Sequence, residues 1–379
     1  MKVIFFVGRE HHALKLANLR SFLQERGNEV VNLIANNAIN IDPASEFIWG
    51  HGPHKHIYEY LYNGLGRDVV TRVDELMAIA LDEKLSTYVP PFWSAYSIWE
   101  ATEFLLLAER MLDKENPDAV VVLHANNFWT RILLYAAQKI GIWTYATQEG
   151  LLRHRDQKTQ GKQSSAAQYV DRLFTWSPAD KQAYINAGIE EKVVTPVGPM
   201  HLDALIGIDV APYREGFRAS LGLEQNKPLV VFAPPAHTHF QGNMQETTLN
   251  LASYALQAGL SLAIRLHPFD SIHGAVKEWT RVYPNVVVPD ESPEMLMKMA
   301  DLVITQHSTI AVEAAFLGTP VGIIDLDSAG ILESPVKDGY GIEISRIEDI
   351  GRALNGEIKP FDLDGWRSVN ATFADGEAT

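Results

Sequence analysis

The sequence predicts an α/β protein with two domains, each built on a doubly wound parallel sheet. Two series of continuous apolar runs alternate with segments of helical periodicity, and the second series starts anew at Lys227. Such runs are typical of parallel strands that helices cover on both faces. At 379 residues the chain also exceeds the usual size of a single hydrophobic core.

The first series begins with an apolar run at 2–8, followed by a helical pattern at 12–27 that Gly27 ends. Residues 36–66 are irregular and rich in His, and no element is expected there. The other elements expected in this series are strands at 29–35, 118–125, 142–150 and 171–177, and helices at 67–85, 94–115 and 130–141.

The second series alternates more regularly, as expected for a sheet with a crossover helix between successive strands. Its expected strands lie at 227–236, 261–268, 285–290, 301–305, 321–326 and 341–345, and its expected helices at 245–258, 272–282, 292–300, 309–317 and 346–356. Ligands of such sheets bind at the carboxyl ends of the strands, so functional residues are expected in the loops that follow the strands.

Composition excludes several classes of protein. No run of 18 or more apolar residues exists, and the opening run is too short for a signal-peptide core, so we expect a cytoplasmic protein. The chain has no Cys, which excludes disulfides, thiolate nucleophiles and Cys-based zinc sites. A net charge of −15 disfavours binding to a nucleic-acid backbone, which needs clustered Lys and Arg.

The stretch 300–326, ADLVITQHSTIAVEAAFLGTPVGIIDL, predicts an anion site. A strand ends at Thr305, either Ser308 or Thr309 caps the following helix, and Gly318 and Pro320 stop it. The unpaired N–H groups and the positive end of the helix dipole then lie at the carboxyl edge of the sheet. Gln306 and His307 precede this helix start.

Glu313 in that helix has two interpretations. It lies four residues after Thr309 and five after Ser308, which does not fit a capping box, where the Glu is three residues after the cap. Glu313 is therefore either a solvated helix residue or a carboxylate that accepts hydrogen bonds from a ribose whose phosphates bind at the helix start.

The stretch 300–321 resembles the donor-nucleotide motif of GT-B glycosyltransferases. RLHP at 265–268 resembles their Arg-x-His-Pro signature, TWSPADKQAYINAGIEEKVVTPVGPMHLD at 175–203 resembles the stretch near their linker, and AAQKIGIWTYATQEG at 136–150 resembles a segment of their first domain. The resemblance covers most of 118–355 and is closest to CDP-glycerol glycerophosphotransferases and capsule polysaccharide transferases. The chain departs from these relatives at Gln306 or His307, where Asp is common, and at Glu149, where His is common.

The resemblance implies a GT-B fold, in which two Rossmann-like domains face each other across a cleft. It implies an acceptor domain at 1–200, a nucleotide-donor domain at 201–355, and a tail at 356–379 that crosses back to the first domain or is partly loose. The implied protein is an enzyme that moves a sugar from a nucleotide-activated donor to a hydroxyl acceptor in surface polysaccharide or glycolipid synthesis. It needs no cofactor and no metal, and a membrane-borne acceptor would bring it to the inner membrane face.

The resemblance also implies a set of donor-binding residues around the diphosphate. Arg265 and His267 lie two apart in one strand and so share a face, where positive charge stabilises a departing nucleotide. The full expected set is His237, Arg265, His267, Gln306, His307, Ser308, Thr309 and Glu313.

Candidates for the catalytic base follow two strands of the first domain. His11 or His12 is the first choice, since the imidazole pKa lies near working pH, and Glu10 either acts as base itself or orients the imidazole. Glu149 is the second choice, while Gly150 beside it fits a tight turn. The three His within 51–56 suggest a metal site, but no fourth ligand is evident. We therefore favour a role of this segment in the acceptor pocket, or a polar surface loop.

Other functions remain open at this point. A CDP-polyol phosphotransferase shares the Arg-x-His-Pro and Ser/Thr signatures. A UDP-sugar 2-epimerase shares the fold but usually has Ser-Gly-Gly where this chain has Ser308, Thr309 and Ile310. A non-catalytic nucleotide or glycan sensor would bind nucleotide without turnover, and the acidic charge argues against a DNA-base glucosyltransferase. The donor nucleotide, the sugar, the acceptor, the stereochemical outcome and the oligomeric state are not predicted.

Overall fold

A computed structural model describes most of the chain and divides it into two compact units. Residues 1–149 and 155–201 form the first unit, and residues 150–154 and 202–379 form the second. The structure describes residues 1–7, 10–34, 54–82, 91–123, 125, 128–150, 170–235, 240, 242–266, 273–306, 308–324, 335–336, 338–359, 362–363 and 365–366.

The first unit contains a seven-stranded sheet in which all neighbouring strands run parallel. Its order is β3-β2-β1-β4-β5-β6-β7, so the order reverses between β1 and β4. Such a reversal is the switch point of a doubly wound sheet. The strands are β1 (Lys2–Val7), β2 (Glu29–Ile34), β3 (His54–His56), β4 (Ala119–Val122), β5 (Trp143–Thr147), β6 (Arg172–Thr175) and β7 (Val194–Pro196).

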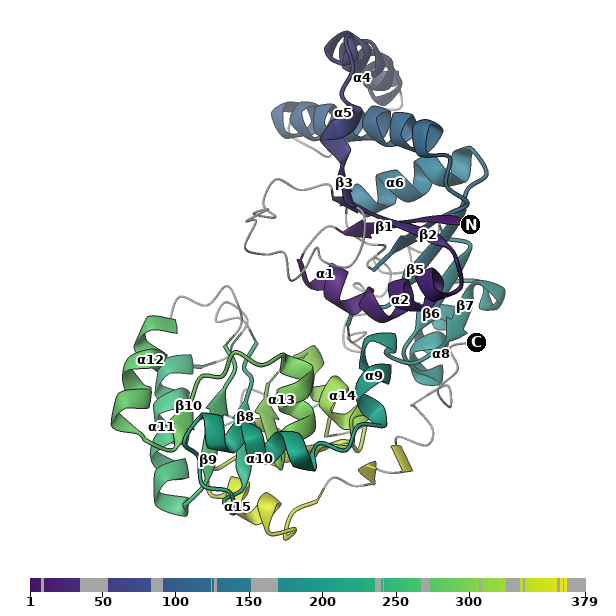
Figure 1. Ribbon diagram of the computed structural model, residues 1–379. Helices are drawn as coiled ribbons and strands as arrows, with labels where there is room; N and C mark the ends of the chain where they lie inside the picture. Colours follow the sequence, from purple (N-terminus) through teal and green to yellow (C-terminus); the bar gives the residue numbers. More distant parts are fainter. Residues whose placement is uncertain are drawn as a thin grey trace. The chain divides into compact units, whose positions relative to one another are not determined.

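Helices cover both faces of this sheet (Figure 1), which explains the continuous apolar runs. In β1, Ile4 and Phe6 pack in one buried cluster with residues of α5 and α6, whereas Val3 and Phe5 pack in another with Leu16. The described helices and 3-10 turns are α1 (Glu10–Lys15), α2 (Ala17–Glu25), η2 (Ile57–Tyr60), α4 (Leu65–Asp82), α5 (Pro91–Glu115), α6 (Phe128–Lys139), α8 (Pro178–Asn186) and η5 (Glu191–Val193), with η6 (Met200–Leu202) at the boundary of the units.

The first unit differs from the sequence prediction in several parts, and α8 and β7 were not expected at all. The single helix expected at 12–27 is divided into α1 and α2, although the Leu16 N–H still donates to the His12 carbonyl at 3.0 Å. The stretch expected to be irregular contains β3, which pairs with β2. This strand reads His-Lys-His and lies at a sheet edge, so it carries no apolar run that would reveal it.

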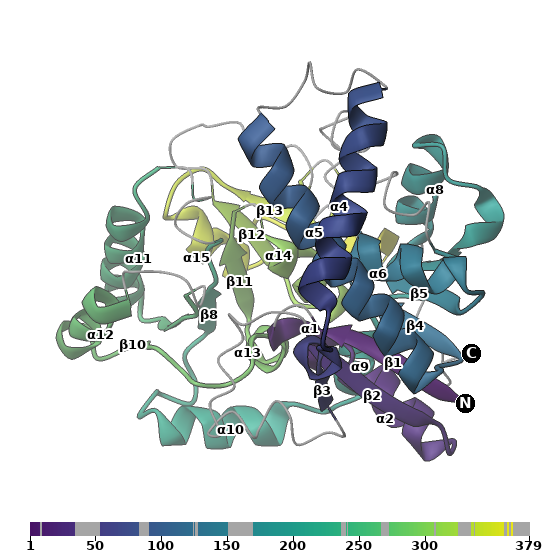
Figure 2. The same ribbon diagram turned by 90° about the horizontal axis from the view of Figure 1, so that it is seen from above.

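The second unit contains a six-stranded parallel sheet of order β10-β9-β8-β11-β12-β13, which reverses between β8 and β11. Figure 2 shows β8, β11, β12 and β13 side by side. The strands are β8 (Leu229–Phe232), β9 (Ser261–Ile264), β10 (Val286–Val287), β11 (Leu302–Thr305), β12 (Val321–Ile324) and β13 (Gly341–Ile344). The helices are α9 (Asp203–Ile206), α10 (Ala211–Ser220), α11 (Met244–Ala258), α12 (His273–Val282), α13 (Pro293–Met299), α14 (Thr309–Phe316) and α15 (Asp349–Leu354).

Local signals set the limits of the second unit's helices. Asn243, Ser292 and Ser308 cap α11, α13 and α14, each with a side-chain oxygen that accepts a backbone N–H. Gly259 ends α11 in the left-handed region at φ 68°. The predicted fold class, two Rossmann-like α/β domains with doubly wound parallel sheets, is confirmed.

The C-terminal segment is described only in part. The Trp366 ring lies 4.6 Å from the Tyr340 ring and 5.2 Å from the Phe316 ring, both within the second unit. The path expected for the tail at 356–379 stays a prediction, since residues 367–379 lie outside the described residues. Among the helices that the structure describes, none is both long and apolar enough to cross a membrane.

Candidate functional site

Two of the predicted catalytic residues meet in the first unit. The loop after β1 leads into α1, which carries His12, and Glu149 follows β5. His12 Nε2 lies 3.3 Å from Glu149 Oε1. The His12 side chain is only 3% exposed and the Glu149 side chain 24%, so Glu149 is the accessible member of the pair. Glu10 and His11 also lie in α1, but their side chains fall outside the described residues.

Three further side chains connect to this pair in sequence of contact: Lys15 belongs to α1, Trp176 follows β6, and His201 lies in η6. Lys15 Nζ donates a hydrogen bond to the Glu149 carbonyl at 3.0 Å and lies 5.4 Å from the centroid of the Trp176 ring. The Trp176 ring is 5.6 Å from the His201 ring. Sequence reasoning did not single out Lys15, Trp176 or His201. The signals available were that Trp176 lies at the end of an expected strand and that both Trp176 and His201 lie in the stretch 175–203.

The loop after β5 is tied to the neighbouring strand. The Gln148 side-chain oxygen accepts a hydrogen bond from the Trp176 N–H at 3.0 Å, and the Gln148 N–H donates to the Phe174 carbonyl at 2.9 Å. Gln148 is buried, so these bonds form away from water, where a broken hydrogen bond costs more. They fix the backbone that carries Glu149.

In the second unit, the predicted helix start lies at the carboxyl edge of the sheet. Ser308 is the N-cap of α14, and its Oγ accepts the Ile310 N–H at 3.3 Å. Thr305, the last residue of β11, donates from Oγ1 to the Ala233 carbonyl at 2.6 Å, which links β11 to the end of β8 across the switch point. The sequence left the cap open between Ser308 and Thr309, and the structure assigns it to Ser308.

Glu313 is buried, with 4% of its surface exposed. Its interpretation as a solvated helix residue is therefore wrong. Burial of a carboxylate is unfavourable unless hydrogen bonds or cations compensate for the lost water. The position of Glu313 five residues after the Ser308 cap also excludes a capping box. The ribose-binding role of Glu313 stays a prediction.

Gly150 has a structural requirement that differs from the expected tight turn. It is not among the described glycines with positive φ. Instead, a Cβ on Gly150 would lie 2.8 Å from Thr309 Oγ1, closer than real Cβ contacts allow. Both residues belong to the second unit. Gly150 is therefore needed for close approach to the first residue of α14.

We expect Gly150→Ala to disturb the start of α14 and to lower the free energy of unfolding by about 1 kcal/mol, as is usual for an overpacked site. Thermal melting of the full chain measures the effect. Gly207→Ala is the matched control, because no atom lies within 4 Å of the Cβ that it would add. Equal melting temperatures for the two variants would contradict this account of Gly150.

The remaining predicted donor residues are described only in part. Arg265 follows β9, is partly buried, and donates its backbone N–H to the Phe232 carbonyl at 2.9 Å. Gln306 is buried directly after β11. His237, His267 and His307 lie outside the described residues. Within the described part of the chain, no three His, Asp or Glu side chains are grouped so that they could hold a metal ion.

The chain matches no family model and no curated protein sequence. Its fold, however, is similar to that of solved nucleotide-sugar enzymes. UDP-GlcNAc 2-epimerase from Neisseria meningitidis, solved bound to UDP-GlcNAc, has a TM-score of 0.66 at 16% identity over 100% of this chain and 97% of that chain. UDP-GlcNAc 2-epimerase from Methanocaldococcus jannaschii has a TM-score of 0.62 at 17% identity, over 99% and 96%.

A third similar structure is the wall teichoic acid polymerase TagF, with a TM-score of 0.58 at 13% identity over 100% of this chain and 85% of that chain. Identities this low establish the fold and leave the reaction open. The chain thus has the GT-B fold that the resemblance in its sequence implies.

Proposed function

We propose that this protein is an enzyme that transfers a sugar from a nucleotide-activated donor to a hydroxyl acceptor. The observation that carries the proposal is the burial of Glu313 on a helix that starts at the carboxyl edge of the second sheet, beside the Ser308 cap. A helix start suits a diphosphate, and a carboxylate one turn further on suits a ribose diol. Solved proteins of the same fold include one bound to UDP-GlcNAc.

In this proposal the second unit binds the donor. Ser308 and Thr309 present the helix start to the diphosphate, with Gln306 before them and Arg265 after β9, which β8 separates from β11. His237, His267 and His307 complete the expected phosphate-binding set from the sequence. Positive groups and N–H donors there stabilise the negative charge that builds up on the departing nucleotide diphosphate.

The first unit supplies the acceptor site and the base. Glu149 is the group that takes the acceptor proton, because its carboxylate is the accessible end of the pair with His12. His12 orients this carboxylate from the buried side, with His11 and Glu10 as the remaining candidates from the sequence. As the acceptor oxygen bonds to the anomeric carbon, its proton passes to the base. The bond from that carbon to the phosphate oxygen breaks, and the nucleoside diphosphate departs with its electron pair.

The proposed chemistry uses the nucleotide sugar as co-substrate and needs neither a metal nor another cofactor. The acceptor is a glycan, a glycolipid or another hydroxyl compound, which fits surface polysaccharide or glycolipid synthesis. A glycolipid acceptor would bring the protein to the inner membrane face from the cytoplasm. Nucleic acid is not a proposed partner, because the net charge of −15 opposes it.

A thermal-shift screen with UDP, CDP, CMP, GDP and ADP tests donor binding. A ligand that binds the native state raises apparent stability by RT ln(1 + [L]/Kd), or about 2.7 kcal/mol at a hundredfold excess over Kd. We expect one nucleotide to raise the melting temperature clearly above the others. No shift with any of the five would contradict the nucleotide site.

The matching activated sugar then distinguishes the reaction. Transfer releases nucleotide diphosphate only when a hydroxyl acceptor is present. Epimerisation would change the sugar signals in proton NMR without an acceptor, and polyol-phosphate transfer would release CMP from a CDP-polyol. Binding without turnover of any donor would identify a sensor. Release of nucleotide diphosphate with formation of a glycosidic product is the result expected here.

We expect Glu313→Gln to weaken nucleotide binding by about 10- to 100-fold, because a charge-assisted hydrogen bond contributes roughly 1.5–3 kcal/mol. Isothermal calorimetry with the nucleotide from the screen measures the change. Glu246→Gln is the matched control, since Glu246 is exposed in the first turn of α11 in the same unit. Unchanged affinity in a folded Glu313→Gln variant would assign Glu313 a structural role alone.

A further inference from the structure

The second unit has a cavity of about 570 Å³ that the proposed reaction does not use. It lies at the amino ends of β8 and β11, whereas Ser308 and Arg265 follow the carboxyl ends of β11 and β9. Its volume falls within the range of pockets that hold small molecules, roughly 300–1,000 Å³. The polar residues that line it are Arg214, Glu215, Arg218, Gln225, Asn226, Lys227 and Asp301.

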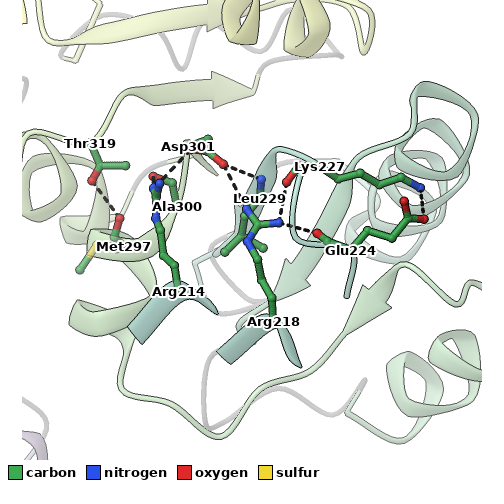
Figure 3. Close-up of polar contacts among 9 residues, drawn as sticks. All are labelled: Arg214, Arg218, Glu224, Lys227, Leu229, Met297, Ala300, Asp301 and Thr319. Atoms are coloured by element: carbon green, nitrogen blue, oxygen red, sulfur yellow. Dashed lines mark hydrogen bonds and ion pairs between the residues drawn. The ribbon is translucent and has the colours of Figure 1, made fainter. Parts of the chain in front are cut away.

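Arg218 has a structural role in this cavity. Its Nη1 donates to the Lys227 carbonyl at 2.5 Å and to the Glu224 carbonyl at 3.0 Å, as Figure 3 shows. Its Nη2 lies 3.5 Å from Asp301 Oδ2. The side chain is 6% exposed, so these contacts hold α10 to the turn before β8 and to the start of β11. Arg218 is therefore largely occupied by the protein itself.

Arg214, one helical turn earlier, has fewer of its N–H donors paired with acceptors of the protein. Its Nη2 contacts the Ala300 carbonyl at 3.0 Å and Asp301 Oδ1 at 3.3 Å (Figure 3). Its Nε is buried, and no acceptor for it exists among the described residues. A buried donor without an acceptor costs about 1–3 kcal/mol. Yet the side chain as a whole is 32% exposed, so an entering ligand can reach the guanidinium.

The charged residues that line this cavity are three cations, Arg214, Arg218 and Lys227, and two carboxylates, Glu215 and Asp301, which leaves one positive charge in excess. Two guanidinium groups share the Asp301 carboxylate, which also accepts the Leu229 N–H at 2.7 Å. Lys227 pairs with Glu224 at 2.6 Å. Burial lowers the pKa of Arg218. The Asp301 carboxylate raises this pKa and the Arg214 charge lowers it, and the net result is a lowered pKa. An anion in the cavity would offset the repulsion between the two guanidinium groups.

We propose that this cavity binds a small phosphate-bearing anion, with Arg214 as its principal ligand and Lys227 as a second cation. The guanidinium of Arg214 offers donors in the planar arrangement that phosphate oxygens accept. The site is separate from the nucleotide site, because the two lie at opposite edges of the same sheet. An occupant would strengthen the attachment of α10 to the start of β11.

Calorimetry on the full chain with inorganic phosphate and pyrophosphate tests this site. We expect Arg214→Gln to weaken binding of at least one of them by about tenfold or more, the effect of losing one charge-assisted hydrogen bond. Arg281→Gln is the matched control, because Arg281 pairs only with the exposed Glu278 among described partners and is 75% exposed on α12. It removes the same charge from the same unit and should leave binding unchanged.

Lys227→Gln is the second variant, used because loss of the Arg214 contacts with Asp301 can also lower stability. Lys227 pairs with a Glu224 side chain that is 63% exposed, so its loss should not affect folding, and we expect binding to weaken severalfold. Equal binding of phosphate and pyrophosphate by wild-type, Arg214→Gln and Arg281→Gln proteins would overturn the proposal. Absence of phosphate and pyrophosphate binding in all three proteins would also overturn the proposal, unless the wild-type protein attaches to the vesicles described next.

Vesicles distinguish the two sources of such an anion. Sedimentation with vesicles of phosphatidylcholine, with and without phosphatidic acid, measures attachment to a lipid phosphate. Attachment that requires both phosphatidic acid and Arg214 would assign the site to a lipid headgroup. Arg214-dependent binding of free phosphate without such attachment would assign it to a soluble ligand. Attachment that is the same in the Arg214→Gln variant, with no binding of free phosphate, would overturn the proposal.

Discussion

Glu149→Gln is expected to slow turnover of the activated sugar by about 10²–10⁴-fold, the usual contribution of a general base. The amide keeps the size of the side chain but cannot accept the acceptor proton. Nucleotide affinity should stay nearly unchanged, because the donor residues belong to the other unit in the proposal. Steady-state rates together with calorimetry separate these two effects, since loss of a proton acceptor lowers kcat and leaves the nucleotide Kd in place.

His12→Ala and His11→Ala, made separately, identify the partner of Glu149. His12 lies 3.3 Å from the Glu149 carboxylate, so its loss should also slow turnover, and the double variant with Glu149→Gln should be little slower than the single variants. Residues that act as one unit show such non-additive effects. Glu190→Gln is the control, because that side chain is 69% exposed and pairs with Lys192 in the first unit.

The possible outcomes of this series are distinct. If both His variants keep full turnover and Glu149→Gln does not, the base is Glu149 without help from an imidazole. If a His variant is inactive while Glu149→Gln is active, the base is that His. If all three variants stay active, the proposed mechanism is wrong, although the argument for the nucleotide site in the second unit would survive.

Glu115→Gln is expected to lower the stability of the first unit by about 2 kcal/mol at pH 7. The Glu115 side chain is 4% exposed at the end of α5 and accepts hydrogen bonds from Lys2 at 2.8 Å, Lys55 at 2.6 Å and Tyr60 at 2.8 Å. These residues join the end of α5 to the interior strand β1, to the edge strand β3 and to η2. Replacement of the carboxylate leaves two Lys groups without their negative partner.

The effect should depend on pH in a defined direction. Burial by itself raises the pKa of Glu115, but the hydrogen bonds from Lys2, Lys55 and Tyr60 outweigh it and lower the pKa from 4.5 to about 2. A lowered pKa in the folded state contributes stability that is fully present above pH 4.5 and is lost as the pH falls towards 2. The difference between wild type and Glu115→Gln should therefore shrink over that range.

Hydrogen exchange of β1 and β4 peptides measures this stability, because it reports on the first unit separately from the second. Glu109→Gln is the matched control on the same helix, since Glu109 lies 3.9 Å from Lys139 and is 32% exposed. Its effect should stay within about 0.5 kcal/mol. A difference for Glu115→Gln that is equally small at pH 7, or that stays constant down to pH 3, would contradict the network.

The strands inside each sheet were predictable because burial on both faces leaves a continuous apolar run. In β1, alternate side chains enter clusters on opposite faces, so all the residues from Val3 to Val7 are apolar. The same reasoning missed β3, whose sequence His-Lys-His has no apolar residue, and it missed β7, which also forms a sheet edge. An edge strand pairs on one side only, so its sequence is under weaker constraint.

The candidate sites were predictable to a different extent. The helix start at Ser308 was visible because its signals are local: a polar cap, helical spacing and the stop at Gly318 all lie within one short segment. The burial of Glu313 could not be predicted, because the sequence of a helix does not indicate which of its faces are covered by the sheet and by neighbouring loops. The role of Gly150 depended in the same way on an atom of Thr309, far along the chain.

The sequence by itself thus determined the fold class, the two strand-helix series and the position of the capped helix start, since each depends on periodicity or capping among near neighbours. Only the tertiary structure decided that His12 pairs with Glu149, that Lys2 and Lys55 share Glu115, and that Arg214 has a buried donor beside Asp301. These contacts join residues distant in the chain. Strand order and register bring them together, and apolar patterns do not encode either.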